Sequence, residues 1–257
     1  NQEEEFQLVQ CSNCGHIYTN PTPVDILKFY PKDYNPHTDK FDFIQKAYYV
    51  LFRNISGEKG QVLDVGAGNG NFLRFMKEKG WKCSGTEVSE YMVNLCNLSG
   101  LDVHKGELCD IKFQTQFDII TFWASLEHMK NPARDLKIAR QLLKKGGRLV
   151  IWVPNICSLE ARLFKKYWHH LEVPTHYSQF RPQTLRYLLE KTGYKVTKIR
   201  HDWLTSAFFP SLQYYLKDRG IKVNLARFRL FSFPFDIFCS IIRRSGLITA
   251  YAVKSDS

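Results

Sequence analysis

The stretch Val62-Leu-Asp-Val-Gly-Ala-Gly-Asn-Gly-Asn-Phe-Leu73 decides the fold of this 257-residue chain. An apolar run typical of a buried strand leads into a glycine-rich turn, and a helical pattern follows. Glycine suits such a turn because the backbone bends tightly and approaches a ligand where a Cβ would interfere. The first N–H groups of the following helix have no partner within the helix and can bind that ligand.

Strand and helix signals alternate on both sides of this turn, which predicts an α/β fold with a parallel sheet covered on both faces. The run Lys144-Lys-Gly-Gly147 is read as a helix stop. The expected strands are Gln61–Gly66, Lys82–Glu87, Leu101–Lys105, Phe117–Trp123, Arg148–Val153, Tyr194–Arg200 and Leu247–Lys254. The expected helices are Gly70–Lys79, Ser89–Leu98, Pro132–Lys144 and Pro182–Lys191.

The remaining segments divide the chain into two parts. Residues 1–58 hold a Cys11-Ser-Asn-Cys14-Gly15 turn and aromatic-rich helical segments, which we expect to form a lid. Residues 59–257 form the core. Two stretches, 155–180 and 201–246, interrupt its alternation. Since open α/β sheets bind ligands at the carboxyl edge of their strands, we interpret both as cap insertions that contribute to substrate binding.

The spacing of the glycines and acids narrows the ligand. A dinucleotide fingerprint has the form G-x-G-x-x-G, whereas Gly66, Gly68 and Gly70 give G-x-G-x-G. Asp64 precedes the turn, and Glu87 ends the next strand. An acid at the end of that strand is placed to accept the ribose hydroxyls of a nucleoside.

This acid-x-Gly-x-Gly-x-Gly motif resembles that of the class I S-adenosylmethionine-dependent methyltransferases. The resemblance covers about residues 60–200, and it extends to the methyltransferase type 11, 12 and 23 group and the ubiquinone-biosynthesis O-methyltransferases. It implies a Rossmann-like three-layer sandwich with a mostly parallel seven-stranded sheet in the order 3-2-1-4-5-7-6.

The resemblance also implies a set of cofactor contacts. The glycines would border the methionine moiety, Asp64 would lie near its amino group, and Glu87 would hold the ribose. Glu107 stands where the family usually has Asp and would lie near the adenine amino group. The full expected set is Asp64, Gly66, Ala67, Gly68, Gly70, Glu87, Val88, Gly106, Glu107, Leu108 and Trp123.

Two histidines are candidates for the chemistry. An oxygen acceptor needs a general base, and histidine suits this role near neutral pH. His128 follows the fourth core strand, and His176 lies in a Trp168…Pro174-Thr-His-Tyr-Ser-Gln-Phe180 segment that resembles one in related bacterial methyltransferases. The alternative for each is a structural role, in ordering the loop or anchoring the insertion.

The Cys11-x-x-Cys14-Gly15 turn is half of a zinc ribbon. A structural zinc ion takes four ligands, and the sequence holds no second C-x-x-C. We therefore favour a metal-free turn, with zinc bound at Cys11 and Cys14 only if a second knuckle lies upstream.

Composition restricts the partners. The formal net charge of +11 favours an anionic partner. The basic-aromatic texture of residues 217–244 is compatible with a cap helix or with peripheral membrane contact. Seven scattered cysteines and the absence of an apolar run of membrane-spanning length predict a soluble cytoplasmic protein.

We therefore predict an S-adenosylmethionine-dependent methyltransferase. Its acceptor would be a small molecule, phosphorylated or lipid-linked, such as a sugar, a glycan precursor or a quinone-like phenol. The sequence shows no separate RNA-binding module, which disfavours a nucleic-acid acceptor. The alternatives are an RNA or protein methyltransferase and a non-catalytic protein that binds the same cofactor for regulation. The oligomeric state stays open.

Overall fold

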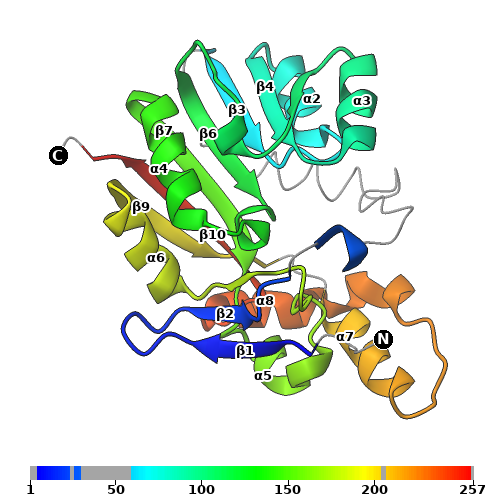
Figure 1. The fold of residues 1–257 in the computed structure, drawn as a ribbon. Helices are drawn as coiled ribbons and strands as arrows, with labels where there is room; N and C mark the ends of the chain where they lie inside the picture. Colours follow the sequence, from blue (N-terminus) through cyan, green and yellow to red (C-terminus); the bar gives the residue numbers. More distant parts are fainter. Residues whose placement is uncertain (1–4, 24–25, 30–58, 204–206, 256–257) are drawn as a thin grey trace.

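The computed structural model describes residues 5–23, 26–29, 59–203 and 207–255. A seven-stranded sheet in the order β5-β4-β3-β6-β7-β10-β9 forms its centre (Figure 1). The strands are β3 (Gln61–Val65), β4 (Lys82–Glu87), β5 (Asp102–Lys105), β6 (Phe117–Trp123), β7 (Leu143–Pro154), β9 (Tyr194–His201) and β10 (Leu247–Lys254). Strands β3 to β7 pair in parallel, and β10 runs antiparallel to both of its neighbours. The predicted order 3-2-1-4-5-7-6 is confirmed.

Helices cover both faces of this sheet, which is why its central strand is apolar on both sides. Val62 packs in a core with α2 (Asn71–Glu78) and α3 (Glu90–Leu98). Leu63 and Val65 pack in the opposite core with α4 (Pro132–Leu142) and α6 (Pro182–Lys191). The alternation of these side chains places the end of β3 between two filled layers and fixes the loop that follows it.

The predicted end of the third helix and the predicted start of the strand Arg148–Val153 are wrong. The expected helix Pro132–Lys144 ends at Leu142, and the expected stop sequence begins strand β7 instead. Leu143 is fully buried and pairs with Phe117 across the sheet. Burial of this leucine in the core outweighs the polar, glycine-rich signal of the four residues that follow it.

A second, smaller sheet was not predicted. Strands β1 (Gln7–Gln10) and β2 (Ile17–Asn20) form an antiparallel hairpin around the cysteine turn, and β2 also pairs with β8 (Ser178–Gln179). A 3-10 helix, η1 (Ile26–Phe29), follows the hairpin. The helical lid expected for residues 22–58 falls largely on 24–25 and 30–58, which lie outside the described residues.

The two insertions pack together at one end of the sheet (Figure 1). The first carries α5 (Leu159–Phe164), η5 (Lys165–Tyr167) and β8, and the second carries α7 (Phe208–Lys217), η6 (Ala226–Ser232) and α8 (Phe233–Ile241). Phe164 and Trp168 of the first pack against Phe208 and Leu212 of the second. None of the helices within the described residues is long and apolar enough to cross a membrane.

Candidate active site

The glycine turn is held at the carboxyl end of β3 by its neighbours on both sides. The N–H groups of Gly66 and Ala67 both donate to the Thr86 carbonyl at 2.9 Å. Gly66 has φ 76°, and a Cβ there would lie 2.6 Å from Cβ of Ser125. The Ser125 hydroxyl donates to the Val65 carbonyl at 2.6 Å. The loop after β6 therefore rests directly against the turn, at a place where only glycine fits.

Glu87 lies at the end of β4 with its carboxylate fixed between two loops. Gly68 N–H donates to Oε2 and Ser89 N–H donates to Oε1, each at 2.9 Å. A carboxylate offers about four lone-pair sites, so two acceptor positions remain. This arrangement fits a ligand with a pair of neighbouring hydroxyls, as a ribose has.

Asp64 lies within strand β3, before the glycine turn, rather than in the turn itself. Its side chain is buried, and Oδ1 accepts a hydrogen bond from the Thr121 hydroxyl at 2.7 Å. Burial raises the pKa of Asp64 to about 8. Its expected place near a ligand amino group stays a prediction.

The residues expected around an adenine follow β5. Gly106 N–H donates to the Glu87 carbonyl at 2.9 Å, which joins this loop to the ribose-side acid. Glu107 precedes η3 (Leu108–Asp110), and its Oε2 forms an ion pair with Nη2 of Arg134 at 2.9 Å. Leu108 is buried. The Glu107 carboxylate is thus paired with an arginine that no sequence pattern indicated.

Val88 and Trp123, the last two residues expected to contact the cofactor, lie in different surroundings. Val88 is exposed beside Glu87. The Trp123 ring packs against Phe72 and Trp152, with ring centroids 5.2 and 6.5 Å apart.

The structure brings the two predicted histidines together. His128 ends η4 (Leu126–His128), directly after the loop that contacts the glycine turn, and His176 comes from the first insertion. Their ring centroids lie 4.5 Å apart with the planes nearly perpendicular. Nδ1 of His128 lies 3.0 Å from the Thr175 carbonyl. Burial lowers the pKa of both imidazoles, that of His128 to about 4.

Two carboxylates accompany the histidines. Glu127 is 1% exposed, and within the described residues neither of its carboxylate oxygens has a hydrogen-bond partner. Burial raises its pKa to about 8. Oε2 of Glu172 lies 3.5 Å from Nε2 of His176. We call Glu127, His128 and His176 the Glu–His cluster.

Backbone strain marks the same place. Ala124, before the cluster, and Glu172, beside it, have φ of 48° and 38°, values that residues with a side chain seldom adopt. Such residues concentrate at functional sites, where the surrounding structure holds them. Glu172 was missed by the sequence analysis, although it stands four residues before His176, within a segment that had been singled out.

The N-terminal hairpin supports the cluster from outside. The Thr19 hydroxyl donates to the His176 carbonyl at 2.7 Å, and Thr19 N–H donates to the Tyr177 carbonyl at 3.0 Å. Thr19 is buried. The position of His176 therefore depends on a strand that lies some 150 residues earlier in the chain, a contact no sequence pattern indicated.

The Glu–His cluster is also where a metal ion could bind. Its three ligand atoms lie within 4.8 Å of one another, and it is the sole group of three such residues found in the described part of the chain. Cys11 and Cys14 lie in the hairpin turn as free thiols, with no third ligand beside them among those residues. Zinc at the cysteine turn is therefore not supported.

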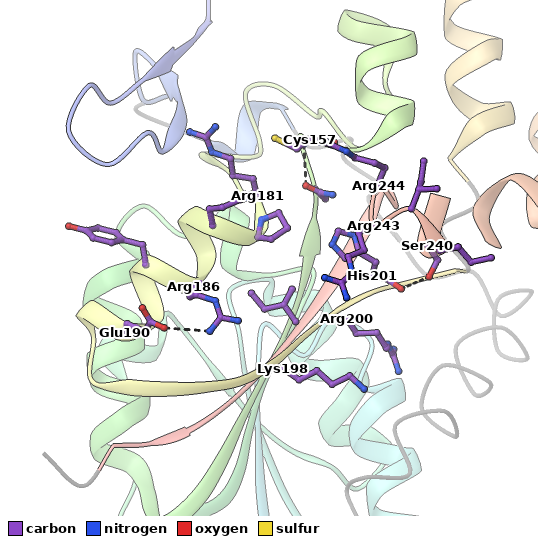
Figure 2. A pocket seen from close by; sticks show the side chains of 17 residues that line it. Cys157, Arg181, Arg186, Glu190, Lys198, Arg200, His201, Ser240, Arg243 and Arg244 are labelled. Atoms are coloured by element: carbon purple, nitrogen blue, oxygen red, sulfur yellow. Dashed lines mark hydrogen bonds and ion pairs between the residues drawn. The ribbon is translucent and has the colours of Figure 1, made fainter. Parts of the chain in front are cut away.

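A cationic cavity of about 1070 Å³ has a lining that includes none of these residues (Figure 2). Its lining comes from α6, β9 and the end of α8. Arg186 is paired with Glu190 at 3.5 Å, and Arg244 donates to the Cys157 carbonyl at 3.4 Å. The basic lining residues are Arg181, Arg186, Lys198, Arg200, His201, Arg243 and Arg244.

Comparison with known proteins agrees with this fold, which is that of a class I S-adenosylmethionine-dependent methyltransferase. Residues 29–199 match the family model described as a methyltransferase domain, and the chain belongs to this family.

The individual relatives and solved structures share a third or less of their aligned residues with this chain. An uncharacterized protein of Methanocaldococcus jannaschii is 26% identical over 147 residues, which are 56% of this chain and 68% of that protein. A ubiquinone biosynthesis O-methyltransferase of Azoarcus sp. is 32% identical over 121 residues, 44% of this chain and 48% of the enzyme. The chain thus spans about half the length of this relative. A methyltransferase from Archaeoglobus fulgidus superposes with a TM-score of 0.58 at 21% identity, covering 83% of this chain and 94% of that one.

Proposed function

We propose that the chain transfers a methyl group from S-adenosylmethionine to a hydroxyl of a small molecule, such as a sugar, a glycan precursor or a quinone-like phenol. The observation that carries this proposal is the buried Glu–His cluster, held against the glycine turn through Ser125. The ubiquinone O-methyltransferases among the relatives support an oxygen acceptor.

The cofactor would be held by residues that already have fixed positions. Glu87 would accept the ribose hydroxyls with its two remaining lone-pair sites. The glycine turn would admit the methionine moiety, and the loop Gly106–Leu108 would border the adenine. When bound, S-adenosylmethionine supplies an electrophilic methyl group on a sulfonium.

The cluster is equipped to activate a hydroxyl. The Thr175 carbonyl can only accept a hydrogen bond, so Nδ1 of His128 carries the hydrogen and Nε2 keeps a lone pair. That lone pair can receive the hydroxyl hydrogen or bind a cation. The His176 ring, which comes from the first insertion, packs against the His128 ring. Either histidine, expected as a general base, would help to remove the acceptor proton while its oxygen is held for in-line attack.

A turnover assay with matched variants tests this proposal. S-adenosylhomocysteine formation would be measured with a panel of nucleotide sugars and catechols, for His128→Ala, His176→Ala and the control His104→Ala. We expect loss of about 100-fold or more in the first two, as for removal of a general acid–base group. His104 is half-exposed on β5 and should be dispensable. Unchanged turnover in both cluster variants would contradict the proposal.

The cationic cavity supports an acceptor that carries a negative charge, such as a phosphorylated or lipid-linked precursor, and contact with an anionic membrane surface. In that case pyrophosphate should compete with the acceptor, and the double change of Arg243 and Arg244 to Glu should abolish this competition. Competition that persists in the double variant would separate the cavity from the acceptor.

A further inference from the structure

We propose that Glu127, His128 and His176 bind a divalent first-row metal ion at the acceptor site. Two imidazoles and a carboxylate form a mixed nitrogen and oxygen donor set, which favours divalent first-row ions such as Fe²⁺ over the purely oxygen-bound Ca²⁺, and Mn²⁺ serves as a paramagnetic probe of the same class. The role of this ion rests on the proposed function, because it would bind and polarise the acceptor hydroxyl. Its binding does not rest on that function and can be measured without an acceptor.

The three donors are close enough to share one ion. Their ligand atoms lie within 4.8 Å of one another. Nitrogen and oxygen ligands stand about 2.1 Å from such an ion, so two adjacent ligands lie about 3 Å apart. Movements of about 1 Å in each side chain, within the range of a small rotation about its bonds, close the difference.

Each histidine is already oriented as metal-binding histidines are. A histidine ligand almost always donates its second ring N–H to a backbone carbonyl or a carboxylate. His128 has the Thr175 carbonyl 3.0 Å from Nδ1, so Nε2 is the ring nitrogen that would bind the ion. His176 has the Glu172 carboxylate 3.5 Å from Nε2. Both outer partners are thus in place.

The buried carboxylate supplies the second, independent observation. Glu127 is 1% exposed, and both of its oxygens lack a hydrogen-bond partner within the described ranges. A buried polar group without a partner is unfavourable, and a bound metal ion is one of the partners that stabilise a buried carboxylate. Glu127 belongs to the group of three whose ligand atoms lie within 4.8 Å of one another, and a cation bound there would supply the partner that its carboxylate lacks.

An ion held there acts on the acceptor in a defined way. Three protein ligands leave coordination positions open, as in catalytic metal sites. The acceptor hydroxyl would occupy one of them, and the ion would lower its pKa so that its proton leaves to water. The histidines would then hold the ion rather than take the proton themselves.

Direct titration with Mn²⁺ tests the inference. The metal-free chain, purified through EDTA, is titrated with Mn²⁺ and the free ion is followed by electron paramagnetic resonance. We expect one bound ion, and a loss of affinity of at least about tenfold in Glu127→Gln, His128→Ala and His176→Ala. The control is the double variant Cys11→Ser, Cys14→Ser, which removes the other candidate ligands and should bind Mn²⁺ as the parent chain does.

Two further measurements make the result decisive. Calorimetric binding of S-adenosylhomocysteine shows that each variant is folded, and Glu172→Gln should weaken Mn²⁺ without removing a ligand atom. Absence of Mn²⁺ binding, or binding that the three cluster variants leave unchanged, overturns the inference. If turnover is then also resistant to EDTA, the proposed function stands without the metal. Mn²⁺ binding at the cluster in a chain that methylates no acceptor would instead contradict the proposed function alone.

Discussion

Removal of the Glu87 carboxylate should abolish most of the affinity for the cofactor. In Glu87→Ala two acceptor positions for ribose hydroxyls are lost, together with the partners of Gly68 N–H and Ser89 N–H. A hydrogen bond to a charged group contributes about 1.5–3 kcal/mol. Two such bonds therefore account for about 3–6 kcal/mol, or a dissociation constant weaker by roughly 10²- to 10⁴-fold.

Two further variants show whether the loss of cofactor affinity is specific to the Glu87 carboxylate. Glu87→Gln keeps one carbonyl acceptor and should lie between the parent chain and Glu87→Ala. Glu90→Ala is the matched control, because Glu90 is an exposed carboxylate three residues further along the chain that pairs with Lys105. Its affinity should not change.

Calorimetric titration with S-adenosylmethionine and S-adenosylhomocysteine measures these affinities, with thermal unfolding as a check that each variant is folded. A folded Glu87→Ala chain that binds either ligand within about threefold of the parent, a difference of only about 0.65 kcal/mol, would refute the assignment of the ribose. Failure of the folded parent chain to bind either ligand would refute the cofactor itself.

Two substitutions test strand β3 and the glycine turn that follows it. Gly70→Ala should lower the free energy of unfolding by about 2–4 kcal/mol, since Gly70 has φ 76° and its Cβ would lie 2.5 Å from Cδ1 of Leu101; an unchanged denaturant midpoint would contradict this. Burial raises the pKa of Asp64 to about 8, above the value of about 3.9 in an unfolded chain. The folded state therefore binds more protons between these values, and stability falls as pH rises through that window. Asp64→Asn should make this fall shallower in melting temperatures taken from pH 5 to 9, and an identical slope would exclude Asp64 as a source.

Sequence patterns predicted the sheet well because its strands are buried between helices. Lys82–Glu87, Phe117–Trp123 and Leu247–Lys254 have the predicted bounds. In these segments the local apolar pattern and the tertiary environment favour the same structure. The start of β7 was missed because the local sequence pattern and the tertiary environment disagree there. Lys144 to Gly147 are polar or glycine, which favours a turn, whereas Leu143 is buried in the core.

The candidate site could be predicted only as two separate histidines. His128 and His176 were found because each lies in a recognisable segment, yet their distance and the roles of Glu127, Glu172 and Thr19 depend on how the insertion and the hairpin pack. Such contacts join residues far apart in the chain, and no local pattern encodes them. The Glu107–Arg134 ion pair was beyond sequence reasoning for the same reason.

The pairing of β2 with β8 means that the proposed acceptor site extends beyond the residues that match the family model. Residues 29–199 match that family, whereas the strand that fixes the His176 backbone precedes residue 29. Substitutions in the hairpin can therefore shift the acceptor side of the site while every cofactor contact stays as it is. The residues proposed to bind the methyl donor and those proposed to bind the acceptor thus lie in different segments of the chain. The acceptor side could then change in evolution while the donor side stays constant.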